Sequence, residues 1–112
     1  AAQAPPEEAG SATTVLGDLE IHPRSRSAKL AGRELKLTTA EFDLLELLAK
    51  SAGTVVSREE LTKLVLGRRL SPFDRAIDMH VSNLRKKLGA LRSGDERIKT
   101  IRGSGYLLAR ED

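Results

Sequence analysis

The segment 71–88, SPFDRAIDMHVSNLRKKL, constrains the fold more than any other part of the chain. Its apolar side chains recur at the spacing i, i+4, i+7 and i+11, which places them on one narrow stripe of an α-helix. The stripe consists of Ile77, Val81, Leu84 and Leu88. Ser71 at the N-cap and Pro72 at the first helical position predict a helix over residues 72–88, and Gly89 predicts its end. We therefore expect one amphipathic helix that packs this stripe on a core.

The opposite face of this helix carries side chains of a different kind. It presents Arg75, Met79, Ser82, Asn83 and Lys86. Cations meet phosphates, a carboxamide pairs with a base edge, and a flexible apolar side chain contacts a thymine methyl. The combination is typical of a DNA recognition helix, although basic helical faces also occur on helices that bind membrane surfaces or partner proteins.

Charge is distributed unevenly along the chain. Residues 68–110 contain eleven Lys or Arg and four Asp or Glu, a net charge of +7, whereas the first 67 residues carry eight cations and ten anions. The whole chain has a net charge of only +3. Positive charge concentrated in the C-terminal third is typical of a surface that binds a polyanion. Small basic domains also show such a distribution when the charge only keeps the protein soluble.

Length and composition limit the class of protein. The 112 residues suit one small domain, which we place at 13–110. Residues 1–12 are rich in Ala, Pro, Gly and Glu and lack the basic start and apolar centre of a signal peptide, so we interpret them as a flexible interdomain linker. No apolar run approaches the ~18 residues of a membrane span. The absence of cysteine excludes disulfides and thiolate zinc sites and is consistent with a cytoplasmic location.

Sequence motifs of catalysis are missing. We find no Ser-His-Asp set, no H-E-x-x-H, no P-loop and no dinucleotide-binding glycine pattern. His22 has no second ligand at the spacing of a metal site, so we expect no metal and no other cofactor. The aromatic residues are Phe42, Phe73 and Tyr106, too few for a platform that stacks single-stranded bases. We therefore expect a binding protein rather than an enzyme.

The remaining segments predict strands, then helices, then a hairpin. Short alternating runs over residues 13–36 predict an antiparallel sheet of about four strands. A capping box at residues 38–41 and a second capping signature at residues 57–60 each introduce a helix. The first helix should bury Phe42, Leu45, Leu48 and Ala49, and the second, which ends at Gly67, should bury Leu61, Leu64 and Val65. Alternating runs on both sides of 103–105 predict a β-hairpin over 98–108. This order describes an α+β fold of the winged helix-turn-helix type.

Three segments carry a family resemblance: LTTAEFDLLELLAKSAGTVVSREEL, FDRAIDMHVSNLRKKL and IKTIRGSGYLL. They are similar to the DNA-binding effector domain of bacterial two-component response regulators of the OmpR/PhoB type, over about residues 13–110. The resemblance implies an N-terminal four-stranded antiparallel sheet, a three-helix bundle and a C-terminal hairpin called the wing. It also implies sequence-specific binding of double-stranded DNA in the control of transcription, with helix 72–88 in the major groove and the hairpin beside the backbone or the minor groove.

The resemblance and the helix face together give the expected DNA-binding residues. On the helix these are Arg75, Met79, His80, Ser82, Asn83, Arg85 and Lys86, and on the wing they are Thr100, Arg102, Gly103 and Tyr106. Several family members have arginine where this chain has Ser82 and Asn83, so the resemblance does not imply an operator sequence. Asn83 is suited to pair with adenine and Met79 to contact a thymine methyl.

Some of these residues have a second interpretation. His80 lies at the edge of the apolar stripe and is explained equally well by packing and by DNA contact. Arg85 is as well suited to pair with Asp74 or Asp78 as with DNA. For Tyr106 we expect that the ring packs on the helices while the hydroxyl reaches a phosphate.

The resemblance also implies partners. A complete protein of this kind has an N-terminal receiver domain, which we expect to be absent from this chain, and a sensor kinase phosphorylates its aspartate. Receiver dimerisation would then raise the local concentration of effector domains at paired direct-repeat sites, and the chain alone should be monomeric. In some relatives the loop corresponding to residues 66–70 contacts RNA polymerase. By this resemblance the corresponding residues here, Gly67, Arg68, Arg69 and Leu70, are expected to contact polymerase, and phosphate contact by Arg68 and Arg69 is the alternative.

Two other classes of binding remain as alternatives. In a protein-interaction module the basic helix would dock on an acidic partner and the wing would add a strand to a sheet. That alternative predicts no change in nucleic-acid affinity when Asn83 or Met79 is replaced. Binding to duplex RNA is disfavoured, because a helix cannot enter its narrow major groove.

Overall fold

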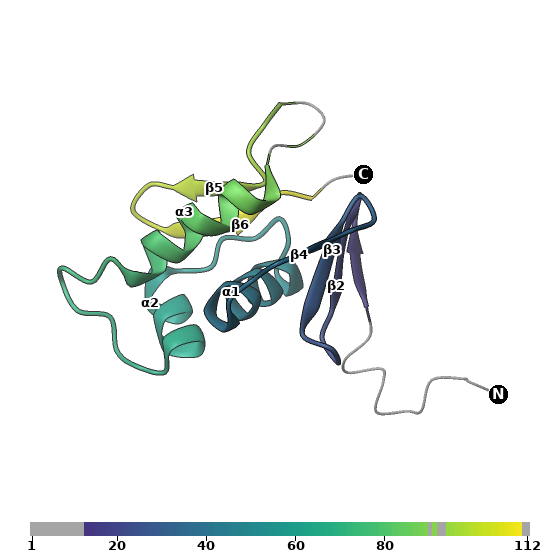
Figure 1. The fold of residues 1–112 in the computed structure, drawn as a ribbon. Coiled ribbons are helices and arrows are strands. Elements are labelled where there is room, and N and C mark those ends of the chain that lie inside the picture. Colours follow the sequence, from purple (N-terminus) through teal and green to yellow (C-terminus); the bar gives the residue numbers. More distant parts are fainter. Residues whose placement is uncertain (1–12, 90, 92–93, 111–112) are drawn as a thin grey trace.

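The computed structural model describes residues 13–89, 91 and 94–110, so the predicted linker 1–12 lies outside the described residues. Figure 1 shows helix α1 in the middle of the molecule, with a four-stranded sheet on one side and helix α3 with a C-terminal hairpin on the other. The predicted α+β winged-helix architecture is confirmed.

The sheet contains β1 (Thr14–Leu16), β2 (Leu19–His22), β3 (Ser27–Leu30) and β4 (Arg33–Leu35), antiparallel in the order β1-β2-β3-β4. Its inner face buries Leu19, Ile21, Ala28 and Leu30. On the other face the register pairs Glu20 with Lys29 and Lys29 with Glu34. Alternation between an apolar face and a charged face is what the sequence over 13–36 predicted.

Helix α1 (Thr39–Lys50) begins with the predicted capping box. The Glu41 N–H donates to Thr38 Oγ1 at 3.2 Å, and the Thr38 N–H donates to Glu41 Oε1 at 3.0 Å. All four apolar residues predicted for its inner face are buried. The helix therefore forms the centre of the core, between the sheet and α3.

The second helix differs from the prediction in its last turns. It starts as α2 (Arg58–Leu61), with Ser57 Oγ accepting from the Glu60 N–H at 3.0 Å, and continues as a π-helical segment (Thr62–Leu66) that ends at Gly67. A π-helical turn contains more residues than an α-helical one, so it rotates the following side chains relative to the 3.6-residue period. The expected burial of Leu64 is therefore wrong: this side chain is 56% exposed, and Thr62 is buried instead.

Helix α3 (Ala76–Leu88) begins later than predicted. Ser71 does not cap it. The Asp74 N–H donates to the Ser71 carbonyl at 3.1 Å, so residues 71–74 form a turn in which Pro72 takes the second position that proline favours. Asp74 Oδ1 then accepts from the Ala76 N–H at 3.0 Å, and Arg75 is the N-cap residue. The predicted stripe is fully buried, and the predicted end at Gly89 is confirmed.

The C-terminal hairpin pairs β5 (Ile98–Ile101) with β6 (Gly105–Leu108), as predicted, and residues 98–108 are called the wing below. A third segment joins it, because Val56 and Tyr106 exchange backbone hydrogen bonds of 2.8 and 3.0 Å. Gly105 makes this close approach possible: its φ is +148°, and a Cβ there would lie 2.1 Å from the Val56 carbonyl oxygen. The wing is thus anchored to the segment that leads into α2.

Candidate DNA-binding surface

The outward face of α3 is open to solvent where the sequence predicted it. Met79 is 64% exposed, and the Arg75 side chain is 80% exposed. Ser82, Asn83 and Lys86 are exposed as well. This face therefore combines cations, a hydroxyl, a carboxamide and a thioether on one rigid helix, and the prediction that Met79 lies outside the core is confirmed.

The wing lies beside this helix, and Arg85 joins the two. Its Nε donates to the Ile98 carbonyl at 2.9 Å and its Nη2 donates to Thr100 Oγ1 at 2.6 Å. The guanidinium also lies 5.8 Å from the centre of the Tyr106 ring. Of the two interpretations of Arg85, pairing with Asp74 or Asp78 does not occur in the structure, because Arg85 lies two helical turns, about 10 Å along the axis, beyond Asp78 and next to β5.

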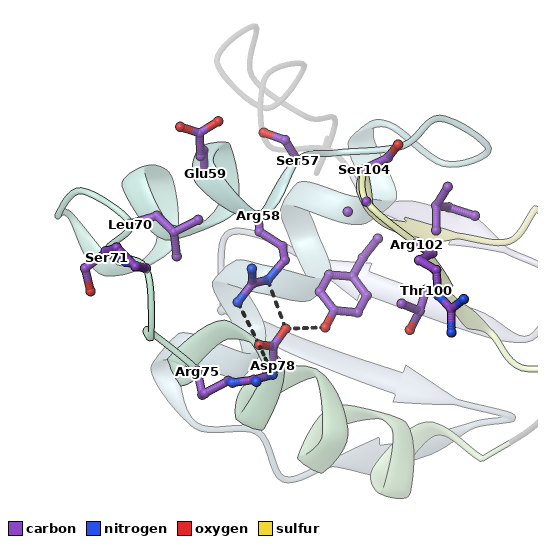
Figure 2. Close-up of a pocket in the computed structure, with 15 residues that line it drawn as sticks. Ser57, Arg58, Glu59, Leu70, Ser71, Arg75, Asp78, Thr100, Arg102 and Ser104 are labelled. Atoms are coloured by element: carbon purple, nitrogen blue, oxygen red, sulfur yellow. Dashed lines mark hydrogen bonds and ion pairs between the residues drawn. The ribbon is translucent and has the colours of Figure 1, made fainter.

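Asp78 has other partners, which Figure 2 shows in the groove between α3, α2 and the wing. Its carboxylate accepts from Arg58 Nε at 3.2 Å and from Arg58 Nη2 at 2.8 Å. Asp78 Oδ1 also accepts a hydrogen bond from the Tyr106 hydroxyl. The expectation that this hydroxyl reaches out to a phosphate is therefore wrong for this structure, because its hydrogen is directed to Asp78.

The electrostatics of this cluster follow from burial and hydrogen bonding. Burial by itself would raise the pKa of Asp78, but the hydrogen bonds from Tyr106 and Arg58 and the charge of Arg58 hold it below the ordinary value. Burial and the hydrogen bond to Asp78 raise the pKa of Tyr106 to about 12. Asp78 is thus a carboxylate and Tyr106 a neutral hydrogen-bond donor around neutral pH.

The groove in Figure 2 has a volume of about 810 Å³ and carries positive charge. Residues 57–59, 70–72 and 100–106 line it, together with Arg75 and Asp78. Arg102 and Thr100 approach it from the wing. Thr100, Arg102 and Gly103 are exposed, so the wing residues of the predicted site lie at the same surface as the start of α3.

His80 and Lys87 lie on another side of α3, towards α1. His80 is half-buried on the side of α3 that faces Glu41. Lys87 Nζ donates to Glu41 Oε1 at 2.5 Å, although the Glu41 side chain is only 4% exposed. Burial opposes the charge of Glu41, yet the bonds from Lys87 and Thr38 hold its pKa below the ordinary value. The sequence predicted only the capping role of Glu41.

The loop before α3 is exposed at Gly67, Arg68 and Arg69 and half-buried at Leu70. Arg68 forms an ion pair with Asp74 at 3.1 Å. Elsewhere in the part of the chain that the structure describes, no group of three His, Cys, Asp or Glu side chains is arranged to hold a metal ion. The helices within that part are also too short or too polar to cross a membrane.

Comparison with known proteins gives the family. The sequence model described as "Transcriptional regulatory protein, C terminal" matches residues 32–108, which is more than half of the chain. The chain belongs to this family. It is an effector domain of the OmpR/PhoB type, as the sequence resemblance implied, and the family consists of transcription regulators rather than enzymes.

Individual relatives of this effector domain include regulators named CpxR. The transcriptional regulatory protein CpxR of Klebsiella pneumoniae subsp. pneumoniae (strain HS11286) is 54% identical over 101 residues, 90% of this chain and 44% of the relative. CpxR of Escherichia coli (strain K12) is 52% identical over 99 residues, 88% of this chain and 43% of the relative. The chain thus spans less than half the length of the curated relatives that it matches. These matches agree with the sequence FDRAIDMH, which is similar to CpxR.

Solved structures agree with the fold of the effector domain. The DNA-binding domain of CpxR from E. coli has 49% identity and a TM-score of 0.86, covering 91% of this chain and 100% of that one. The RstA DNA-binding domain from Klebsiella pneumoniae, crystallised with the RstA box, has 41% identity and a TM-score of 0.80, covering 88% of this chain and 97% of that one.

Proposed function

We propose that this chain binds double-stranded DNA in a sequence-specific manner, as the output domain of a two-component response regulator that controls transcription. The observation that carries the proposal is the outward face of α3, which is exposed, rigid and chemically suited to base edges and phosphates. The similarity to the RstA domain that was crystallised with a DNA box supports it. In this proposal α3 enters the major groove, and the wing lies beside the backbone or the minor groove.

The residues of the surface divide by chemistry into two groups. Met79, Ser82 and Asn83 are assigned to base edges, because short polar and flexible apolar side chains discriminate between bases. The charged residues and the wing are assigned to phosphates, which position the domain without reading sequence. This second group consists of Arg75, Lys86, Thr100, Arg102 and Gly103. His80, half-buried beside α1, and Arg85, which already holds the wing, are assigned to the edge of the phosphate contacts.

The proposed partners extend beyond this chain. The relatives are more than twice as long as the matched region, which supports a receiver domain phosphorylated by a sensor kinase in the complete protein. Residues 1–12 would then be the linker between the two domains. We further propose that the chain alone is monomeric, that the complete regulator occupies direct-repeat half-sites, and that it acts in the cytoplasm.

The loop 67–70 is proposed to contact RNA polymerase rather than DNA. Arg68 is already paired with Asp74, which leaves Arg69 and Leu70 as the side chains of this loop available to a partner protein.

The test is selection of bound molecules from a pool of randomised DNA duplexes at two salt concentrations, followed by sequencing. We expect enrichment of a short motif that persists at the higher salt concentration, because base contacts add to the salt-dependent phosphate contacts. Retention that is salt-sensitive and enriches no motif would contradict sequence-specific binding. It would favour the alternative of a protein-interaction module with a basic helix.

A further inference from the structure

Two side chains of α3 hold the wing at separate points. Near the start of the helix, Asp78 accepts the hydrogen bond from the Tyr106 hydroxyl on β6. Near its end, Arg85 donates to the Ile98 carbonyl at 2.9 Å and to Thr100 Oγ1 at 2.6 Å on β5. Both strands of the wing are therefore attached to the helix, each by a different side chain.

Tyr106 is fixed by its main chain as well as by its hydroxyl. Its N–H donates to the Val56 carbonyl at 3.0 Å, and its carbonyl accepts from the Val56 N–H at 2.8 Å. The residue is only 7% exposed, so the ring is enclosed between the wing and the helices. A side chain held in this way cannot turn its hydroxyl outwards without breaking contacts with Asp78.

Asp78 is an anion in a groove that is also lined by Arg58, Arg75 and Arg102. By itself such a charge repels phosphates. Arg58 neutralises it through two hydrogen bonds, and Arg58 Nη2 also donates to the Asp74 carbonyl at 2.9 Å, just before α3 begins. The carboxylate thus joins three parts of the molecule: the start of α2, the first turn of α3 and β6.

We propose that Tyr106 is a positioning residue for DNA binding: through its hydrogen bond to Asp78 it sets the separation between α3 and Arg102 at the wing tip, and it does not donate to a phosphate. The inference rests on the proposed function. Phosphates along a duplex have fixed spacings, so a wing already held at the right separation spends less conformational entropy on binding than a free hairpin. Arg102 lies in the turn that follows β5, next to the strand that carries Tyr106.

A double-mutant cycle between Tyr106→Phe and Arg102→Ala tests this proposal. Affinity is measured by fluorescence anisotropy on one duplex of mixed sequence, about 20 base pairs long, at low salt, where phosphate contacts dominate. Arg102→Ala should lower the affinity of the wild-type chain about tenfold, and that of the Tyr106→Phe chain less than about threefold. Equal losses in both backgrounds would overturn the proposal, because a direct Tyr106–phosphate contact adds to that of Arg102 independently.

Lys86→Ala is the matched control, because Lys86 lies on α3 itself and its place against a duplex does not depend on the wing. Its replacement should lower the affinity by the same factor in the wild-type and Tyr106→Phe backgrounds. Loss of the Lys86 effect in the Tyr106→Phe background would mean that α3 itself has moved, and it too would overturn the proposal.

Asp78→Ala, which removes both the charge and the acceptor of the Tyr106 hydroxyl, provides a second variant for the same cycle, and it replaces Tyr106→Phe if that variant is unfolded at the assay temperature. Removing a negative charge should strengthen phosphate binding if Asp78 acts by charge alone. If Asp78 instead acts by positioning Tyr106, the variant should bind DNA more weakly than the wild type. Arg102→Ala should then have a smaller effect on affinity in that variant. The cycle uses a duplex of mixed sequence, so it tests the role of Tyr106 even if the selection experiment enriches no motif. Failure of the positioning proposal can therefore be distinguished from failure of the proposed sequence-specific binding.

Discussion

At the residue scale, the exposed face of α3 is proposed to combine side chains that contact bases with side chains that contact the DNA backbone. Asn83 and Lys86 are both exposed and lie three residues apart on the same helix. One is a neutral carboxamide with a donor and an acceptor, and the other is a point charge without an acceptor. Their replacements should therefore change different properties of binding.

Asn83→Ala should relax the preference at one base step by about 1–3 kcal/mol, because a bidentate pair with adenine is lost. Lys86→Ala should weaken binding to all sequences alike and reduce the slope of log K against log[salt] by about 1. Repeating the selection and the salt titration with both variants checks this. A uniform loss for Asn83→Ala, with its base preferences intact, would contradict the assignment of Asn83 to a base.

Glycine is required at Gly105 for a reason that does not apply to Gly103. A Cβ at Gly105 would collide with the Val56 carbonyl, whereas one at Gly103 would meet nothing within 4 Å, although both residues have positive φ. Gly103→Ala should cost about 1–2 kcal/mol of unfolding free energy, from backbone strain. Gly105→Ala should cost about 2–5 kcal/mol, because overpacking adds to the strain. Urea unfolding of both variants measures the difference, and equal losses would contradict it.

At the element scale, the start of α3 shows how two capping signals compete. Ser71-Pro72 and Asp74 both favour the beginning of a helix. The chain uses Pro72 in a turn and Asp74 as the side chain that satisfies the Ala76 N–H. The helix therefore begins after Asp74, and Phe73 is left 93% exposed in the preceding turn.

Asp74→Ala should lower the unfolding free energy by about 0.5–2 kcal/mol, the usual cost of losing a capping side chain. Ser71→Ala should change it by less than about 0.5 kcal/mol, because Ser71 contributes to the turn through its backbone carbonyl. Thermal unfolding followed by circular dichroism compares the two. A larger loss for Ser71→Ala would restore Ser71 as the cap.

At the scale of the whole molecule, charged side chains connect elements that are far apart in the sequence. Glu41 at the start of α1 binds Lys87 in the last turn of α3, and Arg97 binds Asp18 at 3.1 Å, between the approach to the wing and the turn after β1. These contacts hold the sheet, the central helix and the DNA-binding elements in one arrangement.

Glu41 should make the stability of the fold depend on pH. Its pKa is lowered in the folded chain, so its contribution is present above the ordinary value of 4.5 and is lost as the pH falls through the folded-state pKa. Glu41→Gln keeps an acceptor for the capping box but loses the charge, and it should cost about 1–3 kcal/mol at pH 7. Its unfolding free energy should then fall less than that of the wild type between about pH 5 and pH 3.

The exposed Glu59→Gln serves as the control for that measurement, since Glu59 lies in the first turn of α2, away from Lys87. Urea unfolding at several pH values gives the curves. Parallel curves for Glu41→Gln and the wild type would contradict a charged role for Glu41.

The free chain should behave in solution as a monomer near its sequence mass of 12.2 kDa, and one chain should bind each duplex that carries one half-site. The reason is that dimerisation is proposed to belong to the receiver domain. Size-exclusion chromatography with light scattering measures the mass, with dilution over a wide range as the control. A stable dimer of the free chain would contradict this division of roles.

The sequence by itself determined the order of elements, the buried stripe of α3, the capping box of α1, the hairpin and the exposed cations and carboxamide of the DNA-binding face. These features follow from the spacing of apolar residues and from turn and capping residues, all of which lie close together in the sequence. The family resemblance added the role of the wing.

The tertiary structure decided what local patterns cannot encode. The exposure of Leu64 depends on a π-helical turn, and the start of α3 depends on which of two capping signals wins. The partners of Asp78, Arg85 and Tyr106 come from elements 13–28 residues away in the sequence, and Glu41 meets Lys87 across 46 residues. The packing of helices and strands in space determines which side chains pair in this way. From sequence spacing alone, each charged side chain has several candidate partners of the same chemistry, and nothing selects among them.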